Sequence, residues 1–79
     1  MGLDIPQQIR TKVSAGLLPA ASDEPIRVWA GIGTGRLCDA CDRPITVVEF
    51  ESELEGPAGQ PLRFHKPCFD LWRHVRLAR

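Results

Sequence analysis

Two short pairs of candidate metal ligands stand out in the sequence. The first pair is Cys38-x-x-Cys41, and the second pair, His65-x-x-Cys68, follows after residues 42–64. Thiolate and imidazole are donors that Zn²⁺ favours, usually as tetrahedral sets of four. A two-residue gap in a tight turn lets both side chains of a pair converge on one ion, at Zn–S distances of about 2.3 Å. We therefore predict one Zn²⁺ per chain, bound by Cys38, Cys41, His65 and Cys68.

This predicted ion is expected to be structural. Four protein ligands fill the coordination shell, whereas a catalytic zinc keeps a position open for water. The other polar residues near the pairs have simpler uses. His74 lies six residues past Cys68 and is expected on the surface of a helix, while Asp39 and Asp42 are expected to stabilise the turn through local hydrogen bonds. We therefore predict that the chain is not an enzyme.

Other uses of the cysteines stay open as weaker alternatives. A lone Cys-x-x-Cys beside a βαβ unit indicates a redox pair, but a second ligand pair exists here and no long helix is expected after Cys41. Iron–sulfur ligation by three cysteines and one histidine is a rarer alternative. Glycines at positions 31, 33 and 35 resemble part of a dinucleotide-binding fingerprint, which needs a helix directly afterwards. The metal turn follows instead, so we interpret these glycines as its approach.

The N-terminal residues 4–16 predict a short helix. Asp4 is a suitable N-cap, with Gln7 three residues later as in a capping box, and Gly16 is a suitable stop. So short a helix is unstable alone, which means that its apolar stripe docks on the rest of the chain, docks on a second copy, or frays. The stripe repeats every four residues: Ile5, Ile9 and Val13.

A β-hairpin is predicted between the two ligand pairs. Residues 45–55 alternate apolar and acidic side chains, which indicates a half-buried strand. Residues 56–61 are rich in Gly and Pro and predict a turn, and residues 62–64 predict the return strand. The expected core side of the first strand is Val48, Phe50 and Leu54, and the expected solvent side is Glu49, Glu51, Glu53 and Glu55.

A closing helix is predicted over residues 67–78, because Pro67 suits a first turn. A further short strand is predicted over residues 26–29, and its Trp29 is expected in the core. Phe69 falls at the margin of the closing helix's core face. That face is expected to carry Cys68, Leu71, Trp72 and Val75.

The order of metal turn, hairpin and helix resembles a treble-clef zinc finger. More narrowly, Cys38-x-x-Cys41…His65-x-x-Cys68 resembles the first zinc module of a LIM domain, over residues 36–75. A LIM domain continues into a second zinc module, whereas no cysteine follows Cys68 in this sequence. The resemblance implies the zinc site, the local fold and a role in protein binding.

The expected fold class is therefore small α+β, a zinc-stabilised treble-clef-like module preceded by a short helix. Residues 1–25 would form the N-terminal helix and linker, and residues 26–79 the zinc-binding module. The chain has 79 residues, a length at which a metal or a partner commonly supplements the small core.

The composition favours a protein partner over nucleic acid. The net charge is zero, and nucleic-acid binders usually carry a basic surface. The leading prediction is a protein-interaction or regulatory module, with a homodimer through Ile5, Ile9 and Val13 as one form of it. The alternative is a small nucleic-acid-binding or transcription-associated zinc finger that uses the basic C-terminal helix. The chain shows no signal peptide or membrane span and an odd number of cysteines, so a cytoplasmic location is expected.

Overall fold

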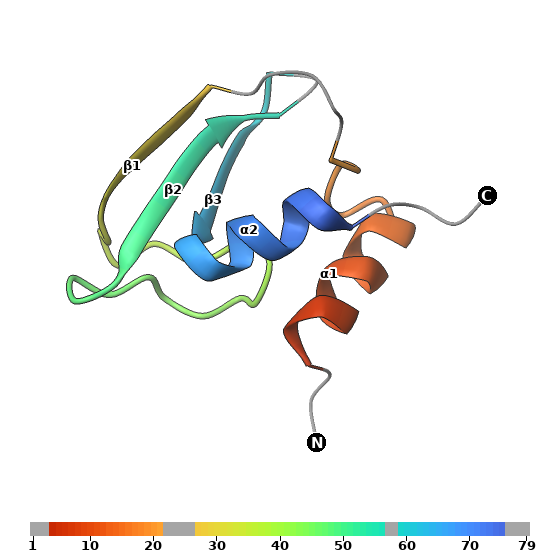
Figure 1. The fold of residues 1–79 in the computed structure, drawn as a ribbon, viewed down its shortest axis with the longest axis horizontal. Coiled ribbons are helices and arrows are strands. Elements are labelled where there is room, and N and C mark those ends of the chain that lie inside the picture. Colours follow the sequence, from red (N-terminus) through yellow and green to blue (C-terminus); the bar gives the residue numbers. More distant parts are fainter. Residues whose placement is uncertain (1–3, 22–26, 57–58, 76–79) are drawn as a thin grey trace.

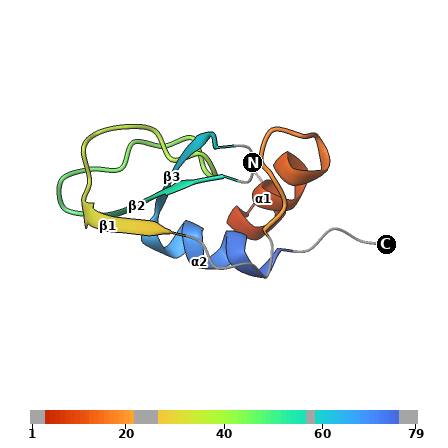
Figure 2. The ribbon, with the colours of Figure 1, turned by 90° about the horizontal axis from the view of Figure 1, so that it is seen from above.

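The computed structural model describes residues 4–21, 27–56 and 59–75, which form two helices and one three-stranded antiparallel sheet (Figure 1). The sheet has the order β1-β2-β3, and α2 packs across one of its faces. α1 lies beyond the end of the sheet, next to α2 (Figure 2). The elements in chain order are α1 (Ile5–Ser14), β1 (Val28–Ile32), β2 (Phe50–Glu55), β3 (Pro61–His65) and α2 (Lys66–His74). The small α+β class expected from the sequence is confirmed.

Both ends of α1 are fixed by the residues that the sequence indicated. The Asp4 side chain accepts a hydrogen bond of 2.8 Å from the Gln7 backbone N–H, which satisfies one of the free donors in the first turn. At the other end Gly16 has φ +79°, and the Leu17 N–H reaches back to the Lys12 carbonyl over 2.9 Å. This is a Schellman ending, which needs a residue in the left-handed conformation.

The apolar stripe of α1 is buried against its own chain. Ile9 is fully buried and Val13 is 6% exposed, while Ile5 is half-buried against the same core. The segment after α1 is tied to α2 as well, because the Trp72 indole N–H donates to the Pro19 carbonyl over 2.9 Å. The structure therefore shows that the apolar stripe of α1 docks on the rest of the chain, which is one of the three alternatives that the sequence left open.

The centre of the core is an aromatic cluster between β3 and α2. The rings of Phe64 and Trp72 stack with centroids 5.2 Å apart, and Phe69 packs beside both. Leu54 from β2 and Leu62 from β3 complete this face of the sheet. The cluster fixes α2 on the sheet, and so fixes the helix that carries the last candidate ligand.

The prediction for the core side of β2 is wrong at two positions. β2 begins only at Phe50, so Val48 lies in the preceding turn and is 89% exposed. Phe50 is also exposed, and of the expected set only Leu54 is buried. The physical reason is the course of α2, which leads from the end of β3 toward α1 and leaves the β1 side of the sheet uncovered (Figure 1).

The predicted solvent face of β2 also needs correction. Glu51 is buried, because it accepts hydrogen bonds from the Thr34 hydroxyl over 2.9 Å and from the Arg63 guanidinium over 3.5 Å. These two groups replace the water that an isolated carboxylate would need. Alternation along the strand indicates which side a residue faces, but not what else covers that side.

Two further core predictions are wrong. Trp29 is 52% exposed, because it pairs with Glu53 on the face of the sheet opposite to the α2-covered face that carries Leu54. On the closing helix, Cys68, Trp72 and Val75 are buried as expected, but the fourth residue of the predicted face is not. Leu71 is exposed, and Phe69 is buried in its place beside Cys68 and Trp72.

Gly33 lies where two segments of backbone meet. A Cβ atom at this position would come within 2.1 Å of the Thr46 carbonyl oxygen, so only glycine fits without a shift of the backbone. Gly35 continues the contact, and its N–H donates to the Ile45 carbonyl over 2.8 Å. These glycines thus hold the chain that enters the metal turn against the chain that leaves it.

Among the described residues no helix has the length and apolar character needed to cross a bilayer.

Candidate metal centre

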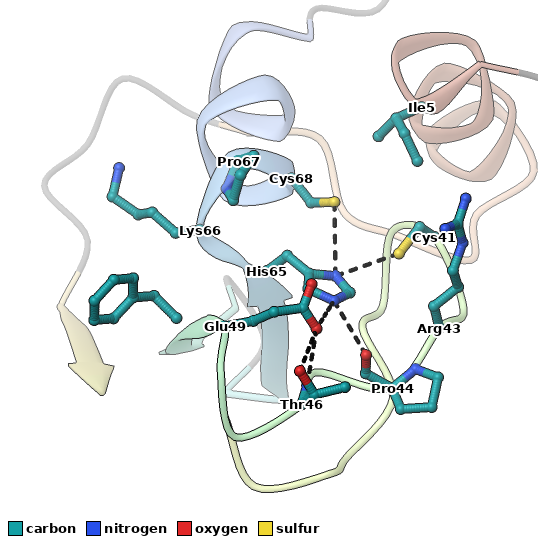
Figure 3. Close-up of a pocket in the computed structure, with 11 residues that line it drawn as sticks. Ile5, Cys41, Arg43, Pro44, Thr46, Glu49, His65, Lys66, Pro67 and Cys68 are labelled. Atoms are coloured by element: carbon teal, nitrogen blue, oxygen red, sulfur yellow. Dashed lines mark hydrogen bonds and ion pairs between the residues drawn. The ribbon is translucent and has the colours of Figure 1, made fainter. Parts of the chain in front are cut away.

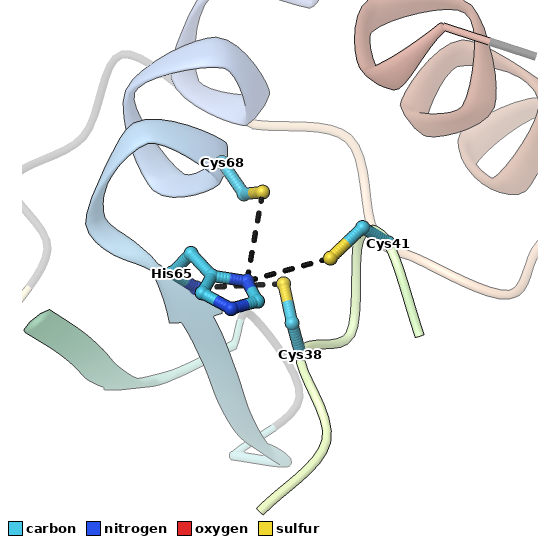
Figure 4. A group of neighbouring side chains, drawn as sticks. All are labelled: Cys38, Cys41, His65 and Cys68. Atoms are coloured by element: carbon cyan, nitrogen blue, oxygen red, sulfur yellow. Dashed lines mark hydrogen bonds between the residues drawn. The ribbon is translucent and has the colours of Figure 1, made fainter. Parts of the chain in front are cut away.

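The structure brings the four predicted ligands into one cluster (Figure 4). Their sulfur and nitrogen atoms all lie within 4.8 Å of one another. Around a tetrahedral Zn²⁺, neighbouring donor atoms are roughly 3.5–3.8 Å apart, given Zn–S of about 2.3 Å and Zn–N of about 2.0 Å. The His65 Nδ1 atom lies 3.4 Å from Cys41 Sγ and 4.0 Å from Cys68 Sγ. The group could therefore hold one metal ion.

The first ligand pair is positioned by a closed turn. The Cys38 N–H donates to the Arg43 carbonyl over 2.9 Å, and the Asp42 N–H donates back to the Cys38 carbonyl over 2.9 Å. Asp42 has φ 63°, a left-handed conformation that Asp tolerates better than most residues. The Cys38 sulfur also accepts the His65 backbone N–H over 3.4 Å, so the turn and the second ligand pair are joined directly.

Asp39 attaches this turn to the sheet. Its N–H donates to the Arg63 carbonyl over 2.8 Å, and its side-chain oxygen accepts the Arg63 N–H over 2.8 Å. The sequence alone predicts a local hydrogen bond within the turn for Asp39. Asp39 instead forms hydrogen bonds with the outer edge of β3. This contact places Cys38 beside the end of β3, where His65 begins the second ligand pair.

His65 is oriented by partners on the far side of its ring (Figure 3). Nδ1 faces the sulfurs, while Nε2 lies 3.2 Å from the Pro44 carbonyl and 3.3 Å from a Glu49 carboxylate oxygen. Glu49 in turn accepts the Thr46 N–H over 2.9 Å and the Thr46 hydroxyl over 3.0 Å. A histidine that ligates a metal commonly donates its other ring N–H to such acceptors.

Sequence reasoning missed Glu49, which it placed on the solvated face of a strand. A signal was present, because Thr46-x-x-Glu49 has the spacing of a capping box. The two residues here close a turn instead of starting a helix. The contact between Glu49 and His65 spans 16 residues of sequence and depends on how the turn meets β3, which no local pattern contains.

The thiols of the cluster shift one another's pKa values. A hydrogen bond from the Cys68 thiol, helped by backbone N–H groups and opposed by burial, lowers the pKa of Cys38 to about 4. The same hydrogen bond and burial raise the pKa of Cys68, and burial raises the pKa of Cys41. Burial lowers the pKa of His65, but Cys38, Glu49 and the Pro44 carbonyl together outweigh burial, so the net pKa is raised. A metal cation that binds here would displace the protons of these thiols.

A lysine from α1, an element that sequence reasoning did not connect with the site, contacts the metal turn. Lys12, in the last turn of α1, lies 2.6 Å from an Asp42 carboxylate oxygen and donates to the Asp39 carbonyl over 2.9 Å. Lys66, adjacent to His65 in sequence, pairs instead with Asp70 one turn later in α2. α1 therefore braces the metal turn from outside.

One side of the cluster opens into a hollow of about 740 Å³ (Figure 3). Cys41 is half-buried on this side, whereas Cys38 and Cys68 are buried. A chelator would therefore approach through Cys41. His74 ends α2 and is not part of the cluster. The hollow has apolar walls, formed by Ile5, Pro44, Phe50 and Pro67.

Comparison with known proteins adds no family. No family model, curated protein or solved structure matches the chain. The fold and the cluster therefore define the class of protein at a coarse level: a small α+β chain with three cysteines and one histidine placed to bind a metal ion.

Proposed function

We propose that the cluster binds one structural Zn²⁺ and that the fold is a single treble-clef module similar to the first zinc module of a LIM domain. The observation that carries this proposal is the convergence of Cys38, Cys41, His65 and Cys68 within 4.8 Å. The order of elements supports it, because the metal turn precedes the β2–β3 hairpin and the last ligand lies in the first turn of α2. Three thiolates and an imidazole favour zinc among the divalent ions.

Such an ion would cross-link the metal turn, the end of β3 and the start of α2. Structural zinc contributes about 10–16 kcal/mol of apparent free energy in zinc-finger peptides, against a typical domain stability of about 5–15 kcal/mol. The ligand set leaves no position for a substrate or an activated water. We therefore propose a non-catalytic protein whose fold depends on its metal.

The exposed apolar side chains support a protein partner. Ile32 and Phe50 lie opposite each other in the β1–β2 pairing, and the turn before Phe50 carries two exposed valines. The exposed fractions are 66%, 72%, 89% and 68% for Ile32, Val47, Val48 and Phe50, which together we name the apolar surface. Exposed apolar groups gathered in one place are typical of interaction sites.

The basic residues near α2 support nucleic-acid binding less well than the exposed apolar residues support protein binding. Arg63 pairs with Glu51 and Glu53 over 3.5 Å and 2.9 Å, and Lys66 pairs with Asp70. These ion pairs neutralise charge that phosphate groups would otherwise use. We therefore propose that the module binds protein through the apolar surface.

Metal content is the first test. Native mass spectrometry of the purified chain should show one zinc per chain, and Cys68→Ser should lose it because a serine hydroxyl is a poor zinc ligand. The matched control His74→Ala should keep it. A folded wild-type chain without metal would contradict the zinc proposal.

The partner proposal is tested separately with the zinc-loaded chain. Cross-linking in a cell extract should identify proteins that are captured by the wild type. The double variant Val48→Asp/Phe50→Asp should not capture them. Leu17→Asp is a suitable control, because Leu17 is 74% exposed but follows α1 and lies outside the apolar surface. Equal capture by all three chains, or retention of nucleic acid with an affinity that falls steeply with salt, would contradict the proposal.

A further inference from the structure

The two edges of the sheet differ. The edge of β3 is covered by the chain's own metal turn, through the two hydrogen bonds between Asp39 and Arg63. β1 forms the opposite edge, and in the described part of the chain it pairs only with β2. Figure 1 shows β1 on the outside of the molecule, away from both helices.

The outward-facing backbone groups of β1 follow from its register. The Gly33 N–H donates to the Glu49 carbonyl on the β2 side over 2.9 Å. Because N–H and C=O groups alternate sides along an antiparallel strand, positions 29 and 31 also face β2. The N–H and C=O groups of Val28, Ala30 and Ile32 therefore point away from the sheet.

β1 lacks the features that usually protect an edge. Natural edge strands commonly carry a charge, a proline or a bulge that prevents pairing with another chain. The sequence of β1 is Val-Trp-Ala-Gly-Ile, with no charged residue and no proline. All five residues are exposed, so nothing in the described structure hinders the approach of another strand.

We propose that β1 pairs antiparallel with β1 of a second copy, about a two-fold axis at Ala30. In this register Ala30 lies opposite Ala30 of the second copy, and Val28 lies opposite Ile32. All three positions have outward N–H and C=O groups, so each can form a hydrogen-bonded pair across the axis. The two sheets then join into one of six strands.

The side chains are self-complementary in the same register. Trp29 falls opposite Gly31, where a Cβ atom would meet nothing within 4 Å, so the exposed indole has room to cover the glycine backbone. On the other face, the exposed Val28 and Ile32 side chains pair across the axis, as β-branched residues do in stable cross-strand pairs. β1 contains no charged side chain, so the pairing brings no like charges of β1 together.

This self-complementarity favours a second copy over an unrelated peptide strand. A foreign strand could use the outward backbone groups, but it would have to supply both the cavity for Trp29 and the small residue opposite Ala30. The inference goes beyond the proposed function, because dimerisation through β1 requires no other protein. It uses Ile32 of the apolar surface, whereas Val47, Val48 and Phe50 lie outside β1.

The test uses the charge of residue 30 in the zinc-loaded full chain. Sedimentation equilibrium should give twice the chain mass of 8.8 kDa for the wild type. Ala30→Lys and Ala30→Glu should each be monomeric, because like charges would face each other across the axis. An equimolar mixture of the two variants should restore the dimer, because opposite charges then face each other. Val48→Lys, with an exposed residue outside β1, is the matched control and should stay dimeric.

Three outcomes would overturn the proposal. The first is a wild type that is monomeric. The second is an Ala30 variant that remains dimeric alone, and the third is a mixture of the two variants that remains monomeric. Far-UV circular dichroism and zinc content of the variants show whether they are folded, which Ala30 should permit because its side chain is exposed. A dimer that forms normally while the Val48→Asp/Phe50→Asp variant still captures the same proteins would contradict only the proposed function.

Discussion

The Lys12 ammonium lies 2.6 Å from the Asp42 carboxylate and so joins α1 to the metal turn across 30 residues of sequence. The Lys12 side chain is only 15% exposed, whereas that of Asp42 is 64% exposed. The ion pair alone is therefore weak, but Lys12 also donates to the Asp39 carbonyl. The helix thus acts as a brace on the left-handed backbone at Asp42.

Replacing Lys12 should weaken this brace. We expect Lys12→Met to lower the free energy of unfolding of the metal-loaded chain by about 1 kcal/mol, since one exposed ion pair and one hydrogen bond are lost. Urea denaturation measures the change, and metal transfer to a chelator should become faster. Arg10→Met on the exposed side of α1 is the control. Equal stability of the two variants would show that the contact contributes nothing.

Removal of the metal should unfold most of the chain. The core of a 79-residue chain is small, and the ligands Cys38 and Cys68 are themselves part of it. Chelation should therefore abolish most of the far-UV circular dichroism, and added zinc should restore it. An unchanged spectrum after complete removal would show that the core suffices without metal.

Glu49 is predicted to be a positioning residue for His65. Glu49→Gln should lower metal affinity about 10- to 100-fold, because partners of a ligating histidine fix its tautomer and ring orientation. Competition with a chelator of known affinity measures this change. Glu55→Gln, at the end of β2, is the matched control. Loss of stability without loss of metal affinity would assign Glu49 to the turn alone.

Acid should release the metal. The raised pKa values of Cys41 and Cys68 mean that both thiols must lose a proton when a metal binds, so falling pH favours the metal-free chain. Hydrogen bonds from Thr46 hold the pKa of Glu49 below its usual value. The stability that the Glu49 carboxylate contributes is therefore fully present above the usual glutamate pKa. It is lost as the pH falls through the lowered pKa of Glu49. Metal content measured from neutral pH down to about pH 4 should decrease steadily; retention throughout would contradict thiolate ligation.

Ser52 provides a test of the core itself. Its hydroxyl is buried and has no hydrogen-bond partner among the described residues. Ser52→Ala should leave stability unchanged or raise it by up to about 1 kcal/mol, because a desolvated hydroxyl is removed. Thermal unfolding of the metal-loaded protein measures the effect. A clear loss of stability would indicate that the hydroxyl has a partner after all.

The sequence by itself determined the features that depend on local chemistry. The cap at Asp4 and the stop at Gly16 are set by which residues accept particular backbone conformations, and the structure confirms both. The spacing within each ligand pair similarly fixed which four side chains could meet. The burial of Trp72 followed from the period of its helix.

Only the tertiary structure decided which faces are covered. Glu51 is buried because Thr34 and Arg63 close over it, whereas Trp29 is exposed because it lies on the same face of the sheet, opposite to the face that α2 covers. The Glu49–His65 and Lys12–Asp42 contacts join distant segments. These features depend on strand register and on where α1 and α2 dock. Register and docking are set by the sum of many long-range contacts, which a local period of hydrophobic residues does not encode.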